Sequence, residues 1–206
     1  MKVHTLVLGA LQTNCYILAD EETKDAIVID APDSAEEIIS FLNSHNYNLK
    51  EIVLTHGHFD HILALEKLKS LTNAPVSIHQ NGEVFLKDVI YNLCHYVGID
   101  WSPVSPDKLL KEGDKVVVGN AELTVIHTPG HTSDCICLYG GGVLISGDTL
   151  FMQSVGRVDH PTGSLEEEVK SIKTKLMMLP DETPVYPGHG PATTIGKERK
   201  ENPYIL

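Results

Sequence analysis

Histidines and an aspartate crowd one short segment, residues 55–61, which reads Thr-His-Gly-His-Phe-Asp-His. Alternate residues of an extended loop point the same way, so His56, His58 and Asp60 can converge on one side. His61 follows as the chain turns into a helix. This spacing differs from the helical zinc motif, in which two histidines lie four residues apart. A single loop histidine is most often an ordinary polar residue, but three of them with an aspartate indicate a metal site.

Three more candidate ligands follow downstream, each in a glycine-containing loop at the end of an expected strand. They are His131 after residues 123–126, Asp148 after 143–145 and His189 after 185–186. Each of these loops is a weak signal alone, although a neighbouring glycine allows close approach of the backbone. Together with the first loop they give five histidines and two aspartates, about twice what one tetrahedral zinc ion uses. The sequence therefore predicts two adjacent divalent metal ions, with zinc as the first choice and iron or manganese as alternatives.

The composition is that of an ordinary globular protein, with 206 residues, 42% of them hydrophobic and 21% charged. We expect one domain over residues 1–206, because no linker or low-complexity stretch interrupts the chain. The net charge of −12 disfavours nucleic acid as a partner and suits bound cations. No apolar run approaches the ~20 residues that span a bilayer, and the N-terminus lacks a secretory signal. With only four scattered cysteines, we expect no membrane partner and a cytoplasmic location.

The hydrophobic pattern predicts strands and helices in two similar halves. Apolar runs at 3–8, 15–18 and 26–29 suggest an antiparallel meander. Further strands are expected at 51–54, 76–78, 115–118, 121–126, 136–139, 143–145 and 185–186. Helices are expected after Ser34, over 62–71, in part of 82–101 and finally after Ser164, with glutamates in the first turns where the helix dipole favours them. This order predicts two sheets packed face to face and covered by helices.

The seven candidate ligands stand in the order found in the metallo-β-lactamase superfamily, and the chain resembles its glyoxalase II-like hydrolases over essentially the whole length. Segments 148–159 and 188–203 also resemble the hydroxyacylglutathione hydrolase pattern. The resemblance implies an α/β fold, a four-layer αββα sandwich of two mixed sheets with the site at one edge. It implies that one metal is held by His56, His58 and His131. The other would be held by Asp60, His61 and His189, and Asp148 would bridge both.

The chain also departs from glyoxalase II proper. That enzyme continues into a C-terminal helical domain that supplies much of the glutathione contact, whereas this sequence ends at Leu206. It also has an aromatic residue after its final metal histidine, where this chain has Gly190. We therefore expect a short hydrolase with a broader or different thioester substrate. The early Asp-Pro-Gly turn appears as Asp30-Ala31-Pro32, so Asp30 is expected to support the ligand loop through an altered turn.

The resemblance implies hydrolysis of a small-molecule thioester, such as S-lactoylglutathione or a related acyl-thiol. A metal lowers the pKa of a bound water to roughly 7, so a hydroxide bridging two ions would attack the carbonyl carbon. Asp60 and Asp148 would be the catalytic carboxylates, as metal ligands and not as general bases. Arg157 is a candidate for binding a substrate carboxylate, with a salt bridge to Asp159 as the alternative. His160 is a candidate for lining the pocket, with a solvent-facing position as the alternative.

Other classes of protein stay open. Asp148 stands where β-lactamases of the superfamily usually carry cysteine, which argues against that activity. Persulfide dioxygenases resemble the chain over the same region and use one iron held by two histidines and one aspartate. A structural or sensor domain would need a closed site with four protein ligands, whereas seven ligands over two metals leave positions open to water. Tyr91, Tyr96 and Trp101 fit either a helical lid or the contact of a homodimer.

Overall fold

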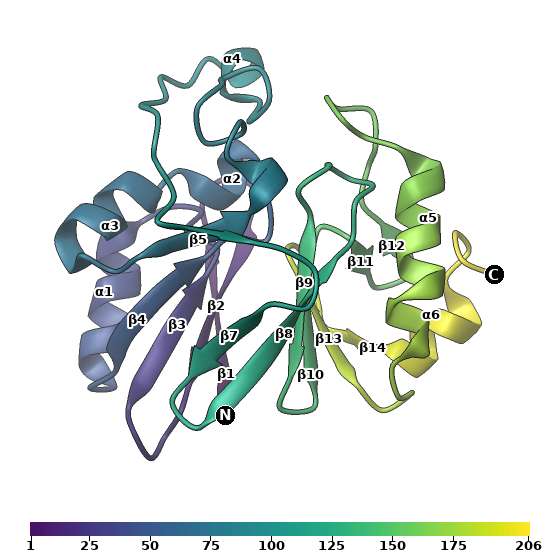
Figure 1. Ribbon diagram of the computed structural model, residues 1–206, viewed down its shortest axis with the longest axis horizontal. Helices are drawn as coiled ribbons and strands as arrows, with labels where there is room; N and C mark the ends of the chain where they lie inside the picture. Colours follow the sequence, from purple (N-terminus) through teal and green to yellow (C-terminus); the bar gives the residue numbers. More distant parts are fainter.

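Two six-stranded sheets packed face to face form the centre of the computed structural model, which describes residues 1–206 (Figure 1). The first sheet has the order β1 (Lys2–Leu8), β2 (Thr13–Ala19), β3 (Asp25–Ile29), β4 (Asn48–Val53), β5 (Val76–His79) and β6 (Lys108–Leu110). The second has the order β14 (Thr193–Thr194), β13 (Pro184–Pro187), β10 (Val143–Gly147), β9 (Ile136–Gly140), β8 (Ala121–His127) and β7 (Lys115–Val118). Both are mixed, since antiparallel pairs adjoin parallel ones.

Helices cover the outer face of each sheet. Helices α1 (Ala35–Ser44) and α3 (Leu65–Thr72) lie on the first sheet, and α5 (Leu165–Thr174) and α6 (Ile195–Glu201) lie on the second (Figure 1). The short α2 (Phe59–Ile62) and α4 (Cys94–Val97) stand at one end of the sandwich, as do the strands of a small hairpin, β11 (Leu150–Phe151) and β12 (Ser154–Val155). Single 3₁₀ turns occupy Gln80–Gly82 and Leu176–Met178. The expected αββα sandwich is confirmed.

Alternation along the strands divides the buried side chains among three layers of core. In β2, Ile17 packs in the layer beneath α1 and α3, whereas its neighbour Leu18 packs in the layer between the two sheets. In β10, Leu144 packs beneath α5 and α6, and Ile145 faces the first sheet. Strands buried on both faces read as continuous apolar runs, which is how β2 and β3 appear in the sequence. The sandwich therefore needs no cross-link, and all four cysteines are buried free thiols.

Several predicted elements differ from the structure. The helix expected over 62–71 is two helices, because the backbone of Ala31 interrupts it: Ala31 N–H donates to His61 C=O, and Ala64 N–H donates to Ala31 C=O. Ser164 caps α5 as predicted, accepting from Glu167 N–H, but Ser34 has φ of 52° and makes no side-chain cap. The helix after Ser164 is not the last, since α6 follows it.

Two further observations concern the expected helical segment and the membrane prediction. Residues 82–101 contain one helical turn, Cys94–Val97, and are otherwise mostly turns. None of the helices has both the length and the apolar character needed to cross a bilayer.

Adjacent valines in β7 offer a matched test of the sandwich. Val116 is fully buried between the sheets, whereas Val117 points outward and is 56% exposed. Val116→Ala should lower the free energy of unfolding by about 2 kcal/mol, through lost burial and the cavity left behind. Val117→Ala should change it by less than about 0.5 kcal/mol. Urea titration measures both, and equal effects at the two positions would contradict this layering.

Candidate metal centre

The seven candidate ligands lie in four loops that meet at one edge of the sandwich. The first loop follows β4 and supplies residues 56–61, while the loops after β8, β10 and β13 supply His131, Asp148 and His189. Parallel pairing of β10 with β13 places two of these loops side by side, and Gly188 N–H donates to Gly147 C=O at 2.8 Å. One sheet thus contributes four of the side chains and the other sheet contributes three.

Three overlapping groups have their ligand atoms within 4.8 Å of one another: His56 with His58 and His131, His56 with His61 and Asp148, and Asp60 with His61 and His189. Asp148 lies between the outer two groups. Its Oδ1 is 3.4 Å from His61 Nε2, and its Oδ2 is 3.7 Å from His131 Nε2 and 3.6 Å from His189 Nε2. Ligands of a tetrahedral zinc ion lie roughly 3.4 Å apart, given bonds of about 2.1 Å. This spacing suits two cations that share Asp148.

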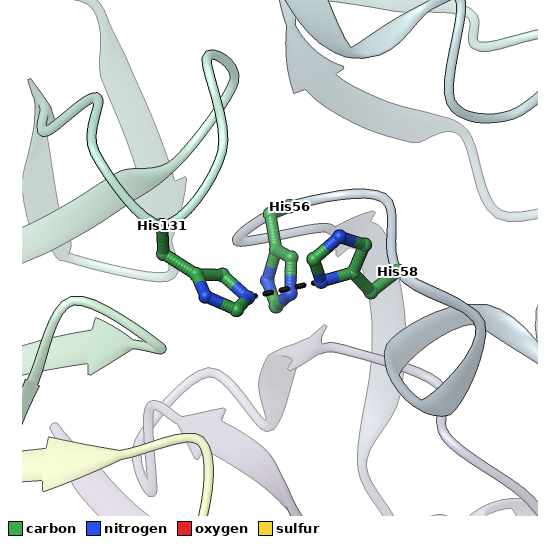
Figure 2. Close-up of side chains that lie close together, drawn as sticks. All are labelled: His56, His58 and His131. Atoms are coloured by element: carbon green, nitrogen blue, oxygen red, sulfur yellow. Dashed lines mark hydrogen bonds between the residues drawn. The ribbon is translucent and has the colours of Figure 1, made fainter. Parts of the chain in front are cut away.

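The imidazoles of His56, His58 and His131 point toward one another from the two sheets (Figure 2). His131 Nε2 and His58 Nδ1 are 2.9 Å apart, and His56 lies beside them. Burial, reinforced by the neighbouring imidazoles, holds the pKa of His56 and of His58 well below the usual value. These rings are therefore neutral, the form that donates a lone pair to a metal.

Several buried polar atoms of the cluster have no hydrogen-bond partner. They include His56 Nε2, His61 Nε2 and Asp148 Oδ1. These three residues form one of the groups whose ligand atoms lie within 4.8 Å of one another. Such atoms are rare, because burying a polar group without a partner destabilises a fold. A cation bound by these atoms would remove that cost. The donor set of imidazoles and carboxylates fits zinc, iron or manganese.

Carboxylates dominate the other side of the cluster. Burial disfavours the charged form of His61, but its neighbours, above all Asp148 and Asp30, raise its pKa well above the usual value. Burial likewise opposes ionisation of Asp148, and the adjacent His61 outweighs it and lowers the pKa of that carboxyl group. The Nε2 of His189 lies 3.1 Å from Asp60 Oδ2. The negative charge of the carboxylates on this side is thus offset by the neighbouring histidines.

Hydrogen bonds behind the cluster fix the orientation of its rings. Asp30, 1% exposed, accepts from Thr55 N–H and Thr55 Oγ1, and its Oδ2 also accepts from His61 Nδ1–H at 2.8 Å. The φ of Asp30 is 62°, so this turn is left-handed without a glycine. His131 Nδ1–H donates to Arg157 C=O at 2.6 Å. His61 and His131 therefore present Nε2 to the centre of the cluster.

Gly188 shows why glycines accompany these ligands. A Cβ atom at this position would lie 2.1 Å from Asp148 Oδ1 and 2.8 Å from His61 Cε1. The strand end thus approaches the cluster as closely as a backbone can, which only glycine permits.

Glu168 is a buried residue of this site that the sequence interpretation missed. It was interpreted as a first-turn acid favoured by the helix dipole, but it is 0% exposed and its Oε2 accepts from His131 N–H at 2.7 Å. Burial raises its pKa to about 8. The helix period carries the missing signal, since Glu168 shares one face of α5 with the buried Ser171 and Ile172. Asp134, also buried, has its pKa raised by burial to about 7.

A pocket of about 930 Å³ opens over the cluster. His58, Asp60, His131, Asp148 and His189 face it. Arg157 and His160 line it too, and His160 lies 5.4 Å from His58 between ring centroids. Arg157 forms the salt bridge with Asp159 that the sequence left as the alternative. Contact of either residue with substrate stays a prediction, as do the metal-ligand roles of the seven side chains.

Sheet order, strand-end loops and the histidine–aspartate cluster together define a metallo-hydrolase fold. The chain belongs to the metallo-beta-lactamase superfamily, whose family model matches residues 8–189.

Two relatives extend over almost the whole chain. An uncharacterized protein of Aquifex aeolicus (strain VF5) is 41% identical over 207 residues, covering 99% of this chain and 97% of that protein. The hydroxyacylglutathione hydrolase GloC of Haemophilus influenzae is 32% identical over 209 residues, covering 100% and 98%. The relatives that align over nearly their whole length thus include a protein named as a hydrolase.

Solved structures with this fold carry different names. BLEG-1, a B3 metallo-beta-lactamase, is 34% identical with a TM-score of 0.94 and 100% coverage of both chains. TTHA1623 in a di-iron-bound form is 33% identical with a TM-score of 0.87, covering 98% of this chain and 99% of that one. ETHE1 from Myxococcus xanthus is 30% identical with a TM-score of 0.84, covering 98% and 84%. One scaffold therefore serves several activities.

The support given by Asp30 can be tested without straining its turn. Asp30→Asn keeps the shape and tolerates a positive φ, but its amide has one acceptor oxygen where the carboxylate has two. Its NH₂ group would then face either Thr55 N–H or the hydrogens of Thr55 Oγ1 and His61 Nδ1, so the three donors cannot all be satisfied. Metal affinity should fall about 10- to 100-fold, as for other groups that orient a ligand. Competition with a chromophoric chelator measures this. Asp33→Asn, in the exposed part of the same turn, is the control, and equal affinities in the two variants would exclude the role.

Glu168 provides a second test, on the loop that carries His131. Glu168→Ala leaves His131 N–H buried without an acceptor, which should cost about 1–3 kcal/mol of unfolding free energy. Glu168→Gln keeps an acceptor oxygen and should lose less than half as much. Thermal and urea unfolding compare the two with Glu167→Ala, an exposed neighbour that should stay near wild type. A stable Glu168→Ala protein would contradict the contact.

Proposed function

We propose that this protein is a dinuclear metal-dependent thioester hydrolase acting on S-lactoylglutathione or a related acyl-thiol. His56, His58 and His131 would hold one divalent ion, and Asp60, His61 and His189 would hold the other, with Asp148 shared. Two such ions supply Lewis acidity toward a carbonyl oxygen and lower the pKa of bound water to roughly 7. Zinc is the first choice among the metals, and iron and manganese suit the same ligands.

One observation carries the proposal: seven ligand-type side chains converge beneath an open pocket, and no nucleophilic side chain joins them there. The pocket lining contains Ser154, but the only residues grouped closely enough to act together are the histidines and aspartates. Asp60 and Asp148 are engaged with histidines at 3.1–3.8 Å, so they serve as ligands and not as general bases. Water must therefore be the nucleophile, which favours hydrolysis of an activated acyl group.

Other residues of the chain orient the candidate ligands. Asp30 and the carbonyl of Arg157 hold the rings of His61 and His131 in place. The backbone at Gly188 packs directly against Asp148 Oδ1, so this strand end helps to hold the carboxylate in place. A thiolate is a good leaving group, so no side chain need protonate it. Preorganised geometry of this kind is what electrostatic stabilisation of a developing oxyanion requires.

A mononuclear iron persulfide dioxygenase is the second candidate, and the similarity to ETHE1 favours keeping it. That activity would use three of the seven side chains. Metal content separates the two functions: close to two ions per chain fits hydrolysis, whereas one iron with oxygen consumption on glutathione persulfide fits the dioxygenase.

The direct test is a substrate panel on protein of measured metal content. It contains S-lactoylglutathione, thioesters of uncharged thiols, glutathione persulfide and a β-lactam, because BLEG-1 bears the name of a β-lactamase. Release of thiol from at least one thioester, lost on chelation and restored by added metal, is the expected result. Turnover of the β-lactam or the persulfide alone would overturn thioester hydrolysis.

Asp148→Ala removes the one carboxylate placed between both groups of ligands. Thioester kcat/KM should fall at least about a hundredfold, since loss of a shared ligand exceeds the 10- to 100-fold effect of an orienting group. Bound metal should drop from two ions toward one, measured by elemental analysis. Asp100→Ala, at an exposed position outside the pocket, is the control. Full activity with two ions bound would remove Asp148 from the centre.

A further inference from the structure

Apolar side chains from three separate segments surround the mouth of the pocket. Leu11 lies in the β1–β2 turn, Leu93, Tyr96 and Val97 lie in and beside α4, and Phe151 and Val155 lie in the β11–β12 hairpin. Three of them are strongly exposed: Leu11 is 54%, Tyr96 is 64% and Val97 is 49% exposed. Apolar groups gathered in the open around a candidate active site indicate a surface that a ligand covers.

The α4 wall, defined as Leu93, Tyr96 and Val97, is fixed relative to the candidate ligands. Asn92 C=O accepts from Phe59 N–H at 2.8 Å, which ties the wall to the residue before Asp60. The side chain of Asn92 is buried, donating to Phe85 C=O and accepting from Cys94 N–H. Leu93 has φ of 70°, a conformation unfavourable for a residue with a Cβ atom, and these bonds maintain it. These hydrogen bonds therefore hold the wall in a fixed position beside the candidate metal ligands.

Leu11 is coupled to the opposite side of the centre. Its carbonyl oxygen accepts from His189 Nδ1–H at 3.2 Å, so the turn that carries this exposed leucine also orients a candidate ligand. Phe151 lies 6.4 Å from His189 between ring centroids. Apolar side chains thus line the pocket both on the α4 wall and beside His189.

Charge in the pocket disfavours an anionic substrate. No lysine lines it, and its one guanidinium, Arg157, donates to Asp159 through Nε at 2.8 Å and Nη2 at 2.7 Å. Asp159 occupies the Nε–Nη2 edge of this guanidinium and offsets its charge, so Arg157 attracts a substrate carboxylate less than an unpaired arginine would. The whole chain carries a net charge of −12, and two bound divalent cations would offset only four of these charges, so the chain as a whole still repels anions.

We propose that the α4 wall and Leu11 form a subsite for an uncharged apolar group of the substrate, so that the preferred thioesters lack the carboxylates of glutathione. This inference rests on the proposed thioesterase function and narrows its substrate class. The apolar group is supplied either by the acyl chain or by the thiol, and the subsite chemistry is the same for both.

A kinetic experiment on the metal-loaded protein separates the two sources. Acetyl and hexanoyl thioesters of N-acetylcysteamine vary the acyl group, and acetyl thioesters of benzyl mercaptan and glutathione vary the thiol. In the arm that fills the subsite, kcat/KM should rise by up to about fourfold per buried methylene. In the thiol arm the benzyl ester should exceed the glutathione ester. The subsite proposal would be overturned if kcat/KM did not change with apolar size in either arm, or if it were higher for the glutathione ester.

Charge variants locate the effect. Val97→Lys should reduce the preference for the apolar thioester at least about fivefold and raise turnover of the glutathione ester. Tyr96→Ala should reduce the same preference without adding charge. Val117→Lys, at a 56% exposed valine of β7 outside the pocket, is the matched control. Thermal unfolding confirms that each variant is folded, and equal behaviour of Val97→Lys and Val117→Lys would contradict the assignment.

A binding measurement distinguishes failure of the subsite from failure of the proposed function. Calorimetry with the non-hydrolysable thioethers S-hexyl- and S-methyl-N-acetylcysteamine needs no turnover. The hexyl compound should bind at least about tenfold more tightly, and Val97→Lys should remove most of that difference. If no thioester is cleaved but this difference is found, the subsite stands and the hydrolysis proposal fails. If thioesters are cleaved and the two thioethers bind equally, the subsite fails alone.

Discussion

Hydrogen bonds between the two sheets, at the edge where the ligand loops emerge, are the constraint on which the centre depends. Ile136 N–H donates to Thr55 C=O at 2.9 Å, directly before His56. Asn14 N–H donates to Gly188 C=O at 2.7 Å, directly before His189, and its side chain donates to the carbonyls on either side of that loop. Because one sheet carries four candidate ligands and the other three, these contacts set the distance between the two halves.

The same edge concentrates buried polar groups that the fold alone does not satisfy. His56 Nε2, His61 Nε2 and Asp148 Oδ1 are buried without a hydrogen bond, and the ion pair of His61 with Asp148 at 3.4 Å offsets only part of the cost in a medium of low polarity. The large apolar layers on both faces of each sheet offset this cost. Cations bound at the cluster would add to stability, because ions that bind only the folded chain shift the folding equilibrium. Function and stability are thus coupled at this edge.

Local patterns carry the features that the sequence could predict. Apolar runs and strand-end loops indicate the sandwich and bring His131, Asp148 and His189 to one edge. The features that the sequence failed to predict depend on contacts between distant segments. Ala31 divides the expected helix at 62–71, and Glu168, favourable as a first-turn acid, is buried because α5 turns that face inward. The sequence indicated a helical lid or a homodimer contact for Tyr96, but it could not show that Tyr96 lines the same pocket as Leu11, which is far away in sequence.

The ligands and the pocket walls are built from different parts of the chain, and this separation explains why one superfamily includes proteins with such different names. The candidate ligands extend from ends of paired strands, where a displaced residue would disrupt the sheet. The walls come from the β1–β2 turn, the long connection between β5 and β6, and the β11–β12 hairpin, which can change without moving a strand. A shared centre therefore supports the class of chemistry, whereas the substrate must be inferred from the walls. Here the walls are apolar and their one guanidinium is paired, so relatives that share the centre are a weaker guide to the substrate than Tyr96, Val97 and Leu11.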